Sequence, residues 1–194
     1  MKFEKLKFAS VTSTNDVAIN LIREKNKLNG CIYSETQTKG RGTYGKKWIS
    51  DKGNLFLSLF FPLDEKHPSF DEFSIINPVI VLNIIKNFCD KKNLNLKFPN
   101  DILYRRKKIC GLLQELITQK DRKFLIIGIG LNIVSNPNIN NGYKATNIYL
   151  ETNKKPSIME IIDLIISSYE NFLVNLSSYN YEDFKKKAEE LSVK

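Results

Sequence analysis

The chain has 194 residues (22.4 kDa), 42% hydrophobic and 26% charged, a composition typical of one globular domain. No apolar run approaches the roughly 20 residues of a membrane-spanning helix. Three cysteines and one histidine argue against a disulfide framework, a zinc site or a Ser-His-Asp triad, so we expect a cytoplasmic protein without a membrane partner. The net charge of +9 favours an anionic partner, namely a nucleotide, a nucleic acid or an acidic protein surface, without choosing among them.

The spacing of apolar residues predicts clustered strands with helices between them. In chain order the expected elements are a strand 5–9, a helix 17–29, a strand 31–35, a polar loop 36–53, a strand 55–60, a helix 71–90, strands 94–98, 108–117 and 123–133 with turns at 105–107 and 119–122, an irregular stretch 135–153, a helix 157–176 and a polar helix from 181. Pro78 should kink or split the helix that contains it. We therefore expect an α+β fold with a mostly antiparallel or mixed sheet flanked by helices.

The segment Gly40–Trp48 combines three glycines, three cations and two aromatic residues. Glycine lets a ligand approach the backbone closely, and cations and flat rings suit an anion that carries a ring. A phosphate-binding P-loop is rejected, because Lys47 stands where that motif needs Ser or Thr, and a strand follows where it needs a helix. A solvated basic hairpin and a nucleic-acid contact are the alternative interpretations of this segment.

Three other segments place polar groups where strands or helices end. Asn100 and Asp101 follow a strand, where they form either a turn or one wall of a cavity, and a hairpin would return Lys108 close to Asp101. Gly128–Asn132 puts glycines in a strand, which favours close approach of backbone or ligand, but it lacks the third glycine of a dinucleotide-binding motif. Ser13–Asn15, taken alone, is a helix cap.

Taken together and in order, these segments resemble the catalytic domain of biotin–protein ligases. The resemblance extends over about residues 6–175 and rests on Ser13-Thr14-Asn15, Gln37, Gly40–Trp48, Lys97–Asp101, Lys108–Gly111, Glu115 and Gly128–Asn132. It implies the biotin–lipoate ligase fold, similar to class II aminoacyl-tRNA synthetases. It also implies a reaction in two steps with ATP and Mg²⁺. Biotin and ATP give biotinyl-5′-adenylate, and a lysine of a biotin carboxyl carrier domain, from acetyl-CoA carboxylase or a related carboxylase, then displaces AMP.

The resemblance assigns a role to each residue of the motifs. Catalysis would use Lys108 between carboxylate and α-phosphate, Arg41 closing over the ligand, and Asp101 orienting or deprotonating the incoming amine. The biotin-binding residues would be Ser13, Thr14, Asn15, Gln37, Arg41, Gly42, Thr43, Lys108 and Gly111. ATP would contact Lys46, Trp48, Asn100 and Asn132, with Mg²⁺ carried mainly by the phosphates and Asn132 as its candidate protein ligand. Two anions in contact repel by about 4 kcal/mol at an effective dielectric near 20, so Arg41, Lys46 and Lys108 are suited to neutralise them.

Departures from the family pattern lead to further expectations. Thr43 stands where relatives carry a second arginine, so we expect weaker retention of the adenylate and some biotinylation of bystander lysines. Phe98 replaces the usual tryptophan and keeps an aromatic surface. We expect residues 1–176 to form the catalytic domain and 177–194 a helical end, without the SH3-like domain or the operator-binding helix-turn-helix domain of some relatives, and hence no DNA binding.

Two alternative functions are kept at this point. Lipoate–protein ligases and octanoyltransferases share the fold and act on a similar carrier lysine, and a comparison of biotin with lipoate as substrate separates them. A non-catalytic basic module that binds nucleic acid would explain the positive charge. That function predicts salt-dependent binding of oligonucleotides and no turnover that depends on biotin.

Overall fold

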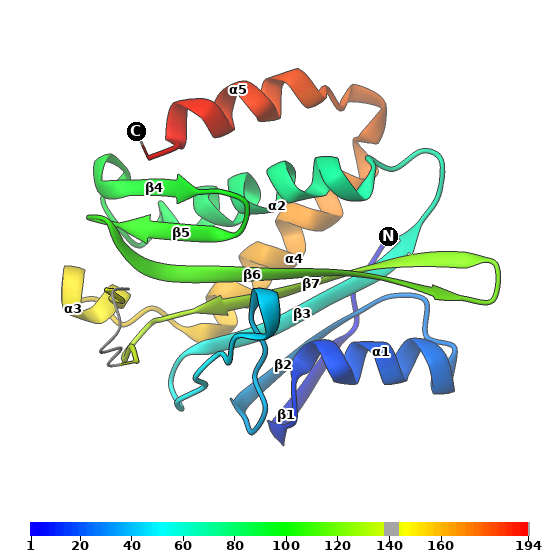
Figure 1. The fold of residues 1–194 in the computed structure, drawn as a ribbon, viewed down its shortest axis with the longest axis horizontal. Helices are drawn as coiled ribbons and strands as arrows, with labels where there is room; N and C mark the ends of the chain where they lie inside the picture. The colour runs from blue at the N-terminus through cyan, green and yellow to red at the C-terminus, as the bar shows by residue number, and fades with distance from the viewer. Residues whose placement is uncertain (138–143, 194) are drawn as a thin grey trace.

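The computed structural model describes residues 1–137 and 144–193, which form a mixed sheet flanked by helices (Figure 1). The strands lie in the order β1-β2-β3-β7-β6-β5-β4. Their bounds are β1 Lys5–Val11, β2 Gly30–Gln37, β3 Leu55–Leu63, β4 Leu94–Lys97, β5 Asp101–Tyr104, β6 Lys107–Gln119 and β7 Arg122–Leu131. The pair β1–β2 is parallel and the other neighbouring strands are antiparallel, which confirms the α+β class and the mostly antiparallel sheet.

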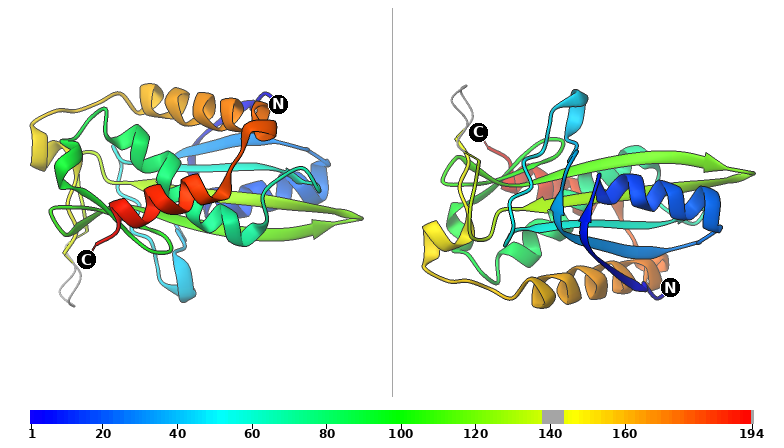
Figure 2. Two further views of the ribbon diagram at one scale, coloured as in Figure 1. Left: turned by 90° about the horizontal axis from the view of Figure 1, so that it is seen from above. Right: turned by 90° about the horizontal axis from the view of Figure 1, so that it is seen from below.

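Helices cover both faces of this sheet. Their bounds are α1 Thr14–Lys25, α2 Phe70–Ile85, α3 Ile148–Thr152, α4 Ile158–Val174 and α5 Tyr181–Leu191. Figure 2 shows α1 and the loop after β2 on one side of the sheet and α4 on the other. The last helix, α5, packs against α2 and β4. Within the described residues, none of these helices has the length and apolar character needed to cross a membrane.

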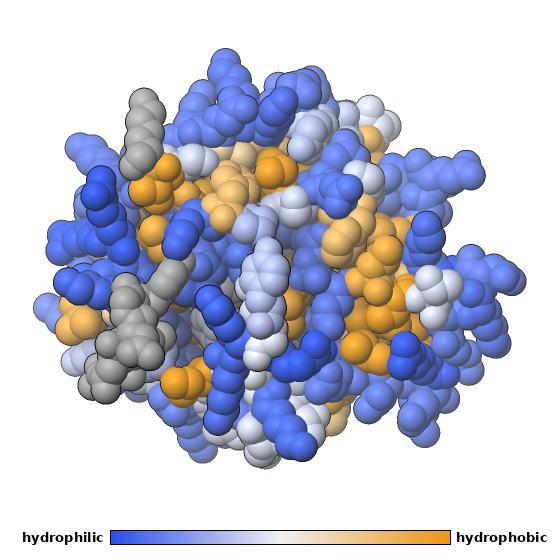
Figure 3. All heavy atoms as spheres, in the orientation of Figure 1, coloured by the Kyte–Doolittle hydropathy of each residue, from blue (hydrophilic) through white to orange (hydrophobic). Residues whose placement is uncertain are grey.

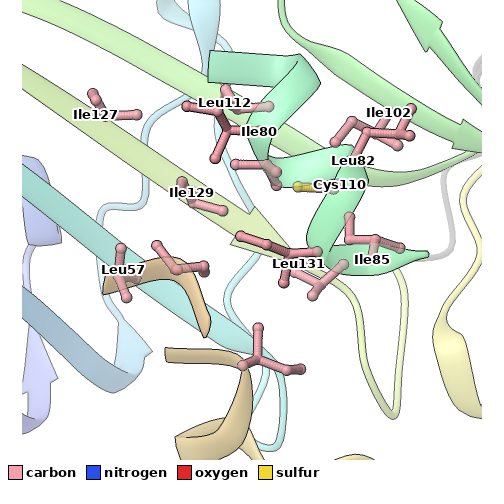
Figure 4. Close-up of a cluster of buried hydrophobic side chains, with 14 of the residues drawn as sticks. Leu57, Ile80, Leu82, Ile85, Ile102, Cys110, Leu112, Ile127, Ile129 and Leu131 are labelled. Carbon is pink, nitrogen blue, oxygen red and sulfur yellow. The ribbon is translucent and has the colours of Figure 1, made fainter. Parts of the chain in front are cut away.

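The core has two parts because side chains alternate between the faces of each strand. Leu57, Leu112 and Ile129, on three adjacent strands, pack with α2 and α4 in the larger part (Figure 4). On the opposite face, Phe60 and Ile126 pack against α1 in the smaller part. The rest of that second face is left for the loop after β2 and for the cavity beneath it.

Helix α2 differs from its prediction at both ends and in its middle. It begins after a capping box, in which Ser69 and Glu72 bond each other's backbone N–H groups, and it ends at Ile85 rather than at Asp90. It continues unbroken through Pro78, so a split at this residue is wrong, while a kink there stays a prediction. Nearly every residue in its second half is buried, and this packing compensates for the backbone hydrogen bond that Pro78 cannot donate.

Two short elements were not predicted. Asp101–Tyr104 is a strand, β5, which pairs with β4 and β6 where the sequence favoured a turn. Helix α3 lies in the stretch 135–153 that was expected to be irregular, and its cap, Asn147, accepts a hydrogen bond from the Leu150 N–H at 2.7 Å. Residues 138–143 of that stretch lie outside the described part. Elements this short depend on tertiary partners rather than on a periodic pattern.

Glu151, in α3, ties that helix to the turn between β5 and β6. Its buried carboxylate accepts a hydrogen bond from Thr146 Oγ1 at 2.7 Å and forms ion pairs with Lys107 at 3.1 Å and Arg105 at 3.5 Å. Burial alone would raise the pKa of Glu151. The hydrogen bond from Thr146 and the two basic neighbours outweigh burial and hold this pKa below its ordinary value of 4.5.

Glu151→Gln should lower the free energy of unfolding at pH 7 by about 1.5–3 kcal/mol. Because the pKa is lower in the folded than in the unfolded chain, the ionised carboxylate stabilises the fold fully above pH 4.5. That stabilisation is lost as the pH falls through the lowered pKa. Urea unfolding of both proteins over this pH range should show the difference shrinking, and a difference that stays constant would contradict the prediction. Glu182→Gln, in an exposed pair with Lys185, is the control and should change stability by less than about 0.5 kcal/mol.

Candidate active site

A cavity of about 760 Å³ lies on the face of the sheet that carries α1 and the glycine loop, which we define as Gly40–Trp48. Every residue to which the sequence assigned a binding or catalytic role lines it: Ser13, Thr14, Asn15, Gln37, Arg41, Gly42, Thr43, Lys46, Trp48, Asn100, Asp101, Lys108, Gly111 and Asn132. Figure 3 shows this face as mainly hydrophilic, with smaller hydrophobic patches. Segments far apart in the sequence are thus brought to one site.

Several uncharged polar groups line the end of the cavity beside α1. Thr14 donates from its backbone N–H and its hydroxyl to Gln37 Oε1, at 2.8 Å and 3.2 Å, and Gln37 Nε2 donates to Ser50 Oγ at 3.0 Å. Ser13 is the N-cap of α1, but its side chain makes no capping hydrogen bond, so helix capping is not what its hydroxyl does. Buried neutral donors and acceptors suit an uncharged polar head group.

Asn15 is held in place from two sides of the same end. Its Nδ2 donates to Glu115 Oε2 at 2.6 Å and to the Leu113 carbonyl at 3.3 Å, while its Oδ1 accepts from Ser58 Oγ at 2.5 Å. Gly128 lies between Ser58 and Leu113 in the sheet, and a Cβ there would stand 2.5 Å from Asn15 Oδ1. Ser58 was not among the predicted site residues, although a lone hydroxyl in an apolar strand was a signal for it.

The floor of the cavity is formed where Gly111 and Gly130 pair across β6 and β7. The indole of Trp48 lies directly on them, because a Cβ would stand 2.7 Å from the ring at Gly111 and 2.4 Å from it at Gly130. This confirms that glycine in these strands permits close approach. The Trp48 Nε1 is buried and has no hydrogen-bond partner among the described residues, and Lys108 Nζ lies 5.2 Å from the ring centroid.

Charged groups gather at the opposite end of the cavity, beside β5. Lys108 Nζ lies 2.5 Å from Asp101 Oδ1, so the predicted approach of these two residues is confirmed. The hairpin of β5 and β6 brings them together, and both side chains are largely buried. Asn100 Nδ2 donates to Thr43 Oγ1 at 3.3 Å, which ties the glycine loop to this end. Lys46 and Lys97 also line the cavity.

The donors available to a metal ion at this site are oxygen atoms. Within the described residues, no group of three or more His, Cys, Asp or Glu side chains could hold a metal. The amide nitrogen of Asn132 donates to the Thr146 carbonyl at 3.0 Å, which leaves its amide oxygen as a possible ligand. Mg²⁺ is commonly held by substrate phosphates and one or two protein oxygens, so these donors fit a cation that arrives with a nucleotide.

Arg41 lies at the α1 end and faces two carboxylates. Its Nη1 and Nη2 bond the two oxygens of Glu115, each at 2.8 Å, and Nη2 also bonds Asp16 Oδ1 at 2.8 Å. The hydrogen bonds to Glu115 raise the pKa of Arg41. The neutralisation of phosphate by Arg41 stays a prediction, since the guanidinium is engaged elsewhere in this structure. The sequence motifs assigned no role to Glu115 or to Asp16.

Comparison with known proteins gives consistent matches. A family model described as "Biotin/lipoate A/B protein ligase family" matches residues 7–132. The bifunctional ligase/repressor BirA of Escherichia coli (strain K12) is 31% identical over 125 residues, which is 63% of this chain and 38% of that protein. The chain therefore spans less than two fifths of the length of this relative.

Solved structures resemble the whole described fold. A biotin protein ligase from Leishmania major in complex with biotinyl-5-AMP has a TM-score of 0.80 at 26% identity, covering 99% of this chain and 81% of that one. A biotin protein ligase from Aquifex aeolicus in complex with biotin and ATP has a TM-score of 0.79 at 25% identity, covering 98% and 78%. The predicted fold is thereby confirmed.

Proposed function

The chain belongs to the biotin/lipoate A/B protein ligase family, and from this premise we propose that it attaches biotin to a lysine of a carrier protein through biotinyl-5′-adenylate. One observation carries the proposal: at the α1 end of the cavity the polar groups are uncharged or, in Arg41, balanced by Asp16 and Glu115, while Lys108 lines the other end. Biotinyl-5′-adenylate has the same division, with an uncharged ureido head at one end and a phosphate at the other. Ser13, Thr14, Asn15 and Gln37 would bind the head.

The first step of the proposed reaction joins two anions. A carboxylate oxygen of biotin attacks the α-phosphorus of ATP, and the bond to pyrophosphate breaks. Lys108 would stand between the carboxylate and the α-phosphate, Lys46 would contact the other phosphates, and Trp48 would lie against the adenine. Mg²⁺, bound to the phosphates and to Asn132, would neutralise further charge. Positioning and electrostatic stabilisation are sufficient for this chemistry, and no protein nucleophile is required.

The second step transfers the biotinyl group. The amine of a carrier lysine attacks the carbonyl carbon of the adenylate, an amide bond forms and AMP leaves with the electron pair of the broken bond. Asp101, beside Lys108, would orient the amine or accept its proton. We propose the biotin carboxyl carrier domain of acetyl-CoA carboxylase, or of a related carboxylase, as the partner, and the cytoplasm as the location.

Exchange of labelled pyrophosphate into ATP tests the proposal directly. We expect exchange with biotin and ATP together, and none above background when biotin is omitted or replaced by lipoate or octanoate. Transfer to a biotin carrier domain should then label one lysine. Exchange that ignores biotin would reject the proposal, and exchange with lipoate alone would establish the alternative function of the family.

Thr43→Arg should make the adenylate dissociate about tenfold more slowly, because one hydrogen bond from a charged donor contributes about 1.5–3 kcal/mol. In the wild-type chain Thr43 contacts Asn100 and brings no charge to the loop. Release of labelled biotinyl-5′-adenylate from each protein measures the effect, and biotinylation of added albumin should fall in parallel. Thr43→Gln, which is long but uncharged, is the control. Equal release rates for the wild-type chain and Thr43→Arg would contradict the expectation.

A further inference from the structure

The glycine loop lines the cavity, and the side chains of two residues in its first half tie it to the rest of the molecule. At the β5 end the tie is the hydrogen bond from Asn100 to Thr43. At the α1 end it is the side chain of Arg41. The loop also folds back on itself, with Gly42 N–H donating to the Lys46 carbonyl at 2.7 Å. The placement of the loop over the cavity therefore depends on side chains as well as on its own backbone.

The tie at the α1 end joins three separate segments. Arg41 comes from the loop, Glu115 from β6 and Asp16 from the first turn of α1. The guanidinium meets both oxygens of Glu115 in parallel, which is the strongest and most directional geometry of an ion pair. The three side chains are only 24–38% exposed, so solvent screens them less than a fully exposed pair. Asn15 also donates to Glu115, which links the tie to the head-group end of the cavity.

The charges at this tie balance one another. One guanidinium meets two carboxylates, so the charge of Arg41 is already compensated before a ligand binds. Lys108 stands beside Asp101 at the other end of the cavity, and Lys46 lines the cavity from the loop. In the unliganded protein the contacts of Arg41 thus hold the loop in position.

We propose that Glu115 and Asp16 are positioning residues that clasp Arg41 and hold the glycine loop closed over the α1 end of the cavity before any ligand binds. The consequence of this clasp for the reaction rests on the proposed function: a biotin head group bound beneath the loop leaves only when the clasp opens. The clasp itself needs no ligand, so it can be tested separately from the reaction.

Limited trypsin digestion of the unliganded protein tests the clasp, because cleavage of a transiently opened loop reports the population of its open form. The loop region contains four trypsin sites, at Lys39, Arg41, Lys46 and Lys47. In the double variant Asp16→Asn, Glu115→Gln we expect cleavage at these sites to be about tenfold faster than in the wild-type chain. Glu115→Gln alone should have a larger effect than Asp16→Asn alone, because Glu115 makes two of the three contacts.

Asp163→Asn is the matched control, since it removes an acidic partner of an exposed ion pair, with Lys5, between α4 and β1. It should leave loop cleavage unchanged. The wild-type chain offers a test that does not depend on the folding of a variant. Salt near 1 M screens ion pairs, so loop cleavage relative to cleavage at Lys91 and Lys92 should rise with salt in the wild-type chain and not in the double variant. Equal loop cleavage in the two proteins at low salt, or loop cleavage in the wild-type chain that does not rise with salt, would overturn the clasp.

A kinetic measurement tests the consequence for the ligand. In a wild-type chain that shows biotin-dependent exchange, Glu115→Gln should raise the KM for biotin about tenfold and change kcat and the KM for ATP less than about twofold. A residue that only stabilised the fold would not produce this division. If the wild-type chain shows no exchange, the proposed function fails while the digestion result stands. If exchange is normal and the KM for biotin is unchanged, the positioning role fails.

Discussion

Lys108→Ala should reduce kcat/KM for biotin-dependent pyrophosphate exchange by about 10²–10³-fold, the usual cost of removing a group that stabilises charge in a transition state. Lys108 lies in the cavity between Trp48 and Asp101, at the end where the carboxylate of biotin and the α-phosphate of ATP would meet. Without its ammonium, the two anions would approach each other with less compensation. Steady-state exchange with each substrate varied in turn measures the effect.

Lys107→Ala is the matched control for this prediction. Lys107 is the preceding residue, and its ammonium pairs with Glu151 rather than lining the cavity. Its removal should change exchange less than about twofold. Lys108→Ala removes a cationic partner of the Asp101 carboxylate and could disturb folding. The double variant Asp101→Asn, Lys108→Gln removes both charges of this pair, so that a loss of folding can be told apart from a loss of chemistry. Wild-type exchange in a folded Lys108 variant would contradict the assigned role.

The sequence predicted the site better than it predicted the elements that form it. The motifs consist of chemically distinctive residues at fixed spacings, which is why the site could be predicted. All of the proposed residues do line one cavity. In contrast, β5 has four residues and α3 has five, too few for a periodic pattern to show. The continuity of α2 through Pro78 also depends on burial between other elements, which no local pattern expresses.

Contacts between side chains far apart in the sequence also could not be predicted from the sequence. Asp16 looks like a capping residue because of its place before an apolar run, yet its carboxylate reaches Arg41, which is 25 residues further along. Ser58 looks like part of an apolar strand, yet it bonds the Asn15 side chain. Such roles depend on the register of β3, β6 and β7, and a sequence pattern does not fix which residues lie opposite each other.

Gly128→Ala and Gly130→Ala should impair different substrates, although the two residues share one face of β7. A Cβ at Gly128 would stand 2.5 Å from Asn15 Oδ1, and Asn15 has little freedom to move because Ser58 and Glu115 both bond it. We expect the KM for biotin to rise about 10²-fold, the cost of a misplacement of about 1 Å. The KM for ATP should change far less.

At Gly130 the clash is with the Trp48 indole, 2.4 Å from the new Cβ, so the surface proposed for the adenine is displaced and the KM for ATP should rise instead. Exchange kinetics with biotin and ATP varied separately measure both constants. Ile127→Val, on the same strand but facing the opposite core, should lower stability by about 0.5–1.5 kcal/mol and leave both constants unchanged. The two substitutions clash with Asn15 and with Trp48, which the proposal places in different parts of the cavity. If both variants raised the KM for the same substrate, the division of the cavity into a head-group end and a nucleotide end would be wrong.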